Sequence, residues 1–116
     1  MLRLTNAFII LVAATLGACS GYASATSPIP NDGHTIAATP SLAFTPATLT
    51  VSAGQAVTFA FGSVAHNVFF DQQAGAPSAI DGQNAGVSIE RIFTTAGNYH
   101  YTCHIHPGMQ GTVVVR

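Results

Sequence analysis

The sequence predicts an all-β sandwich or barrel, and three observations support this fold class. Apolar residues alternate with polar ones through residues 48–61, several short apolar runs follow, and glycine-containing turns separate them. No convincing helical period of apolar residues follows the first twenty positions. With 116 residues there is room for one domain, so we expect about six to eight short strands packed face to face.

The strands follow one another in a regular order. In "TLTVSAGQAVTFAF" (48–61) the alternation continues on both sides of a turn at Ala53 and Gly54. The stretch 71–86 is rich in Gly, Ala, Gln and Asn and is expected to be a loop with no regular element. Further strands are expected at "AHNVFF" (65–70), "VSIERIF" (87–93), "YHYTC" (99–103) and "GTVVVR" (111–116).

The first twenty residues, "MLRLTNAFIILVAATLGACS", predict export from the cytoplasm. Arg3 precedes an apolar run at 4–16 that is too short to span a bilayer comfortably. The small residues of "LGAC" resemble the cleavage box of bacterial lipoproteins, in which the cysteine is lipidated. We therefore expect a signal peptide at 1–18, a lipid anchor on Cys19, and location in the periplasm or on a cell-envelope membrane. The alternative is an ordinary signal peptide cut after an alanine such as Ala25.

Residues 19–40 predict a flexible linker between this anchor and a folded domain at 41–116. The linker segment is small, polar and proline-rich and has no apolar period. His34 lies within it and is interpreted as a solvent-exposed histidine.

Charge is too scarce for a nucleic-acid partner. Charged residues make up 6% of the chain, the net charge is −1, and the three basic residues are arginines far apart in sequence. A nucleic-acid interface needs a basic stripe, which three scattered arginines cannot form.

The segment "YTCHIHPGMQG" (101–111) predicts three ligands of one metal ion. Side chains alternate along a strand, so Cys103 faces inward and His104 faces outward. Pro107-Gly108 forms a turn that brings His106 and then Met109 back toward Cys103. His104 would join these residues only if the strand ended one residue early.

A fourth ligand is expected from His66, within the apolar segment "SVAHNVFFD". A thiolate, two imidazoles and a thioether together favour a type 1 copper site, because thioether has little affinity for zinc, calcium or magnesium. Structural zinc would more typically show a CxxC pair, which this sequence lacks. Cys103 would otherwise be a lone thiol in an oxidising compartment if Cys19 carries lipid.

Three segments resemble the signature segments of the cupredoxin family, in its plastocyanin/amicyanin branch: "FTPATLTVSAGQAVTFAF", "VAHNVFFD" and "AGNYHYTCHIHPGMQGTVVV". The resemblance covers about 42–115. It implies a Greek-key β-sandwich, one copper ion held by His66, Cys103, His106 and Met109, and a hydrogen bond from Asn67 to the cysteine loop. The spacing Cys-x-x-His-x-x-Met is similar to the short amicyanin-type ligand loop.

Nothing in the sequence offers an open coordination position or an acid–base group for substrate chemistry, so we expect a one-electron carrier and not an enzyme. We expect it to be a monomer that serves redox partner proteins. The resemblance adds the path of the electron. The exposed edge of His106 would pass the electron, within an apolar patch for which the candidates are Val64, Ala65, Pro107 and Gly108.

An alternative is a periplasmic copper-binding or copper-handling protein without a role in a redox chain. His100 and His104 would then form a loose accessory copper site on the outer face. The other interpretation of this pair is two surface histidines.

Overall fold

The computed structural model describes residues 33–116, which form nine β-strands and no helix. The strands are short, with two to six residues each. Their bounds are β1 Thr35–Ala38, β2 Phe44–Thr45, β3 Thr48–Val51, β4 Ala56–Phe61, β5 His66–Phe70, β6 Ile80–Asn84, β7 Ser88–Ile92, β8 Gly97–Thr102 and β9 Gln110–Val115.

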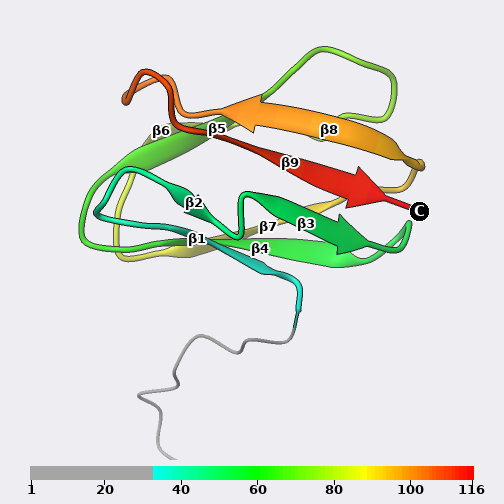
Figure 1. The fold of residues 1–116 in the computed structure, drawn as a ribbon, viewed down its shortest axis with the longest axis horizontal. Helices are drawn as coiled ribbons and strands as arrows, with labels where there is room; N and C mark the ends of the chain where they lie inside the picture. The colour runs from blue at the N-terminus through cyan, green and yellow to red at the C-terminus, as the bar shows by residue number, and fades with distance from the viewer. Residues whose placement is uncertain (1–32) are drawn as a thin grey trace, which may run out of the picture.

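The strands form two facing sheets (Figure 1). One sheet has the order β2-β1-β4-β7 and the other has the order β3-β9-β8-β5-β6. Strands β1 and β4 are parallel, as are β3 and β9, whereas the remaining pairs are antiparallel. This arrangement confirms the predicted all-β sandwich, with more strands than expected.

Alternation along each strand creates the core between the sheets. In β4, Val57, Phe59 and Phe61 are buried and point to the same side, as the sequence pattern predicts. From the opposite sheet, Tyr99 and Tyr101 of β8 enter the same buried cluster. The ring of Tyr101 meets that of Phe59 edge-on, with centroids 5.4 Å apart. Tyr101 lies two residues before Cys103, and both belong to the same buried cluster, so this aromatic core extends to the residue directly after β8.

The predicted linker 19–40 is wrong at its end, because the folded domain begins before residue 41. Residues Thr35–Ala38 form β1, which pairs in parallel with β4, and Ile36 is fully buried in the core. His34 precedes this strand and is partly buried, and its backbone carbonyl accepts a hydrogen bond from the Thr58 amide at 2.9 Å. The expected signal peptide, Cys19 and the first part of the linker lie outside the described residues.

The predicted loop 71–86 also contains a strand. Residues Ile80–Asn84 form β6, which pairs with β5 at the edge of the five-stranded sheet. The side chain of Arg91 on β7 stabilises the segment just before β6. It donates hydrogen bonds to the carbonyls of Ser78 and Ala79 at 2.8 and 2.9 Å.

Within residues 33–116, no helix is long and apolar enough to cross a membrane.

Candidate metal centre

Three side chains from two separate parts of the chain converge at one end of the sandwich. His66 begins β5, Cys103 follows β8, and His106 lies in the loop before β9. Their potential ligand atoms all lie within 4.8 Å of one another. The two Nδ1 atoms of His66 and His106 are 3.1 Å apart, and Cys103 Sγ is 3.6 Å from His106 Nδ1. Among residues 33–116 no other group of His, Cys, Asp or Glu side chains comes together in this way.

The loop that carries Cys103 and His106 is closed by backbone hydrogen bonds. The Cys103 amide donates to the Met109 carbonyl at 2.9 Å, and the Met109 amide donates to the His106 carbonyl at 3.2 Å. Gly108 has φ of +87°, a conformation that glycine adopts without strain, and so the chain can reverse here. Met109 is only 4% exposed and belongs to the same buried cluster as Cys103. The loop thus returns Met109 to the side of the strand from which Cys103 projects.

His66 is held in one tautomer. Its Nε2 lies 3.0 Å from the carbonyl oxygen of Thr39, which can only accept a hydrogen bond. Nε2 therefore carries the proton in the neutral ring, and Nδ1 keeps its lone pair directed toward Cys103 and His106. Sequence reasoning missed this contact, because a backbone carbonyl carries no signal in residue identity.

The environment of His66 also favours the neutral, metal-binding form of the ring. Burial lowers the pKa of His66 below its ordinary value, and the nearby His106 lowers it further. The hydrogen bond to Thr39 acts in the opposite direction and is the smallest of the three effects. An imidazole must be neutral to bind a metal, so both dominant effects prepare this ring for a cation.

Asn67 connects β5 to the metal-binding loop. Its Oδ1 accepts a hydrogen bond from the backbone amide of His104 at 2.7 Å. The contact lies one residue after each of His66 and Cys103, and it therefore fixes the separation of the two chain segments that carry them. This hydrogen bond is the one implied by the family resemblance.

His104 and His100 lie apart from this cluster. The ring of His104 is exposed and stacks on Phe69, with centroids 3.9 Å apart and planes 6° from parallel. His100 contacts Asp71 through Nδ1 at 3.1 Å and Gln110 through Nε2 at 3.0 Å. Each histidine is thus engaged separately, and together they do not form a group of converging ligands.

The end of the molecule around His106 is apolar and carries no charged side chain. It is formed by the β1–β2, β4–β5, β6–β7 and β8–β9 loops, which gather at one end of the sandwich in Figure 1. None of these loops contains Asp, Glu, Lys or Arg. Three of the four exposed large apolar residues lie here: Leu42, Val87 and Ile105, which are 47%, 46% and 36% exposed. We call this surface the loop end.

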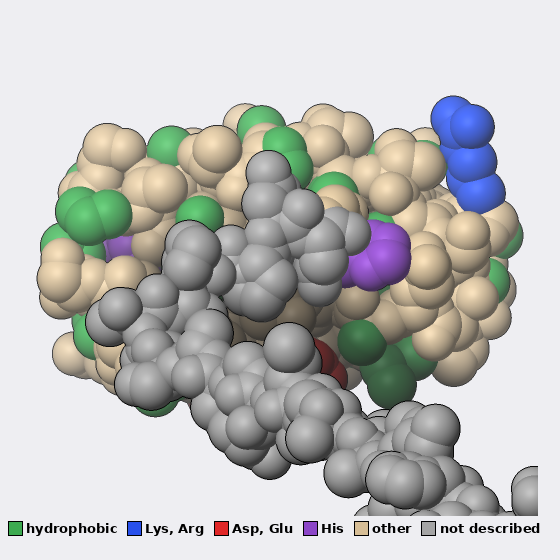
Figure 2. All heavy atoms as spheres, turned by 90° about the horizontal axis from the view of Figure 1, so that it is seen from below, with side chains coloured by type: hydrophobic (Ala, Val, Ile, Leu, Met, Phe, Trp, Pro, Cys, Tyr) green, Lys and Arg blue, Asp and Glu red, His purple; other side chains and the backbone are tan. Residues whose placement is uncertain are grey.

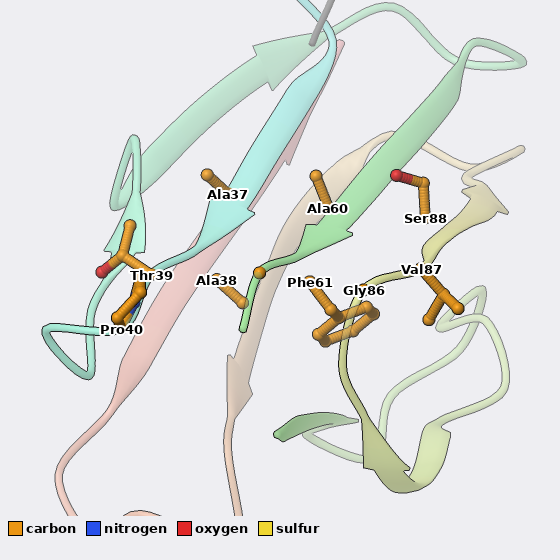
Figure 3. Close-up of a pocket in the computed structure, with 10 residues that line it drawn as sticks. Ala37, Ala38, Thr39, Pro40, Ala60, Phe61, Gly86, Val87 and Ser88 are labelled. Atoms are coloured by element: carbon orange, nitrogen blue, oxygen red, sulfur yellow. The ribbon is translucent and has the colours of Figure 1, made fainter. Parts of the chain in front are cut away.

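The rest of the visible surface is also poor in charge. Figure 2 shows one face of the molecule, where blue and red atoms occupy only small areas among uncharged side chains. A hollow of about 360 Å³ lies between β1, β4 and β7. Figure 3 shows Ala37, Ala60 and Ser88 pointing to the same side of this sheet. None of the residues that line the hollow has an ionisable side chain, so it offers no group for acid–base chemistry.

Comparison with known proteins agrees with the chemistry of this site. Residues 32–116 match the model of the copper-binding proteins of the plastocyanin/azurin family. A chloroplastic plastocyanin from Tetradesmus obliquus is 41% identical over 86 residues, covering 65% of this chain and 59% of that protein. The chain thus spans less than two thirds of that relative. A plastocyanin from Scenedesmus fuscus is 38% identical over 86 residues, covering 65% of this chain and 88% of the relative.

The fold of this chain is also similar to that of a solved amicyanin structure. The reduced Cu(I) form of an amicyanin variant superposes with a TM-score of 0.62 at 27% identity, covering 73% of this chain and 83% of amicyanin. Two imidazole nitrogens and one thiol sulfur lie within 4.8 Å of one another, with His66 and Cys103 buried and His106 partly buried, and this donor set suits copper. By the match over residues 32–116, this chain belongs to the plastocyanin/azurin family of copper-binding proteins and is a cupredoxin whose cofactor is copper.

Proposed function

We propose that the protein is a one-electron carrier with a single type 1 copper site formed by His66, Cys103, His106 and Met109. The observation that carries the proposal is the convergence of two imidazoles and a buried thiol, with Met109 returned to the same side by the loop. Copper in such a donor set supplies a one-electron redox couple.

The protein contributes a rigid arrangement of ligands. Thr39 holds the ring of His66, Asn67 holds the backbone next to Cys103, and Met109 closes the loop by two backbone hydrogen bonds. Side chains fixed in this way move little when the charge at the site changes, which favours fast electron transfer. All four donors come from the protein, and this supports a carrier and not an enzyme, since no position remains for a substrate.

The loop end supports docking to redox partner proteins. His106 is partly exposed there, Val64 and Ala65 are partly buried, and Pro107 and Gly108 are exposed. An apolar surface with no charged residue suits brief contacts in which the partner comes close to the ring of His106. We propose that the protein acts as a monomer in the cell envelope, exported by its leader and anchored through lipid on Cys19.

The alternative role in copper handling would use His100 and His104 as an accessory site. His100 contacts Asp71 and Gln110, whereas His104 stacks on Phe69. Because the two rings are engaged separately, these contacts favour the electron carrier over the accessory copper site. Reversible voltammetry separates the two roles, because a carrier keeps its copper through repeated oxidation and reduction.

The test of the site is the visible spectrum of the purified protein after addition of Cu(II). We expect an intense thiolate-to-copper band in the native chain and none in the Cys103→Ala variant. The Cys103→Ala variant should keep its fold, because alanine fills most of the position of a small buried thiol. Absence of the band in the native protein would remove the basis of the proposal.

A further inference from the structure

We propose that Asn84, on edge strand β6, is a positioning residue of the copper centre that acts through the backbone of His66. The inference rests on the proposed function, in which His66 binds copper. Asn84 is not one of the clustered ligand residues. Its side-chain amide donates a hydrogen bond to the carbonyl of His66, the residue that bears the first ligand.

The pairing of β5 with β6 is irregular beside His66. His66 faces Asn84 and Val68 faces Ile80, so Asn67 on β5 stands opposite residues 81–83 on β6. Such a bulge leaves backbone groups without a regular ladder partner. Gly82, with φ of +88°, lies within the bulge. The side chain of Asn84 adds a connection between the edge strand and β5 beside this irregularity.

Asn84 makes this connection with one amide group. Its Nδ2 lies 3.1 Å from the carbonyl oxygen of His66 and 3.0 Å from that of Asp81. Both partners are acceptors, so the amide must present its two N–H groups to them. Aspartate, which has the same shape, would place an oxygen against two carbonyl oxygens.

The carbonyl that Asn84 holds belongs to the peptide group between His66 and Asn67. Each of these residues makes one of the contacts that define the site, His66 with Thr39 and Asn67 with the amide of His104. Rotation of the peptide group would shift both side chains at once. Loss of a contact that orients a metal ligand typically lowers metal affinity about 10–100-fold.

The test compares Asn84→Asp with Gln83→Glu, which adds the same charge at the neighbouring exposed position of β6. Both variants are loaded with Cu(II), and the loss of copper to a chelator is followed by the visible band. We expect loss at least about tenfold faster from Asn84→Asp than from the native protein, and within about twofold of native from Gln83→Glu. Equal rates in the two variants would overturn the proposal.

A second measurement needs no copper. In the metal-free native protein, NMR should detect a scalar coupling across the hydrogen bond from Asn84 Nδ2 to the carbonyl carbon of His66. The ring nitrogen shifts of His66 should change in Asn84→Asp and stay unchanged in Gln83→Glu. If Asn84→Asp does not fold, the coupling in the native chain decides, and its absence refutes the role. Failure of the native protein to give a copper band would refute the proposed function and leave this NMR result unaffected.

Discussion

Two buried tyrosines on β8 should respond oppositely to loss of the hydroxyl group. The hydroxyl of Tyr101 is buried and has no hydrogen-bond partner among the atoms of residues 33–116. That of Tyr99 donates to the carbonyl of Thr95 at 2.6 Å. The substitution to phenylalanine is the same at both positions, and each ring remains in the core. The two variants therefore isolate the effect of the hydroxyl group.

Tyr101→Phe should raise the free energy of unfolding by about 1 kcal/mol, and by up to about 3 kcal/mol if the hydroxyl is fully desolvated. The aromatic contacts should persist, because the rings of Phe44, Phe59 and Phe70 meet the ring of Tyr101, which the substitution keeps. The same burial raises the pKa of Tyr101 well above its ordinary value, so its ionised form is strongly disfavoured.

Tyr99→Phe should lower the free energy of unfolding by about 1 kcal/mol, because a hydrogen bond is lost and the Thr95 carbonyl is left without this donor. Urea unfolding of the metal-free protein at neutral pH measures both changes. The two variants should differ by about 2 kcal/mol or more. Destabilisation of Tyr101→Phe as large as that of Tyr99→Phe would show that the Tyr101 hydroxyl is satisfied and would refute the reasoning.

Three further changes test other parts of the structure. Gly111→Ala should destabilise the fold by about 1–3 kcal/mol or more, because the added methyl group would collide with the buried side chain of Tyr101. The control in the same unfolding assay is Gly62→Ala, whose added methyl group would lie at an ordinary 3.7 Å from the carbonyl oxygen of Ala38. The metal-free protein should lose stability as pH falls below about 6.5, because His66 binds a proton more readily in the unfolded chain than in the folded one, where its pKa is lowered. The free energy of unfolding, measured at several pH values, should depend less on pH in His66→Gln. An unchanged pH dependence in this variant would contradict the assignment to His66. The rate of electron self-exchange between two copies of the protein, measured by NMR line broadening, should change less than about threefold between low salt and about 0.5 M salt, because the loop end carries no charged residue. A steep dependence of this rate on salt would show that charges elsewhere on the surface control the encounter.

Much of the fold could be predicted because its strands alternate clearly. Strand β4 shows this best, since every second residue from Val57 to Phe61 enters the core. Strand β1 was missed because "TIAA" is short and weakly apolar, and its parallel pairing with β4 depends on residues distant in sequence. Strand β6 was missed because "IDGQN" is polar and contains glycine, and it becomes a strand through its pairing with β5.

The candidate site could be predicted in part, for chemical reasons. Cys103, His106 and Met109 lie close together in sequence, and their residue types alone favour copper. Strand alternation also indicated that His104 turns outward, and it is exposed in the structure. The contacts of Thr39 and Asn84 with His66 could not be foreseen, because one uses a backbone carbonyl and the other depends on an irregular edge strand.

The central claim is that one copper ion in this site accepts and donates one electron reversibly. A stepwise redox titration of the Cu(II)-loaded protein, followed at the thiolate-to-copper band, tests it most directly. We expect the band to saturate at one copper per chain, to disappear after one electron per copper, and to return fully on reoxidation. Loss of copper on reduction, or a band that needs more than one copper per chain, would contradict the account.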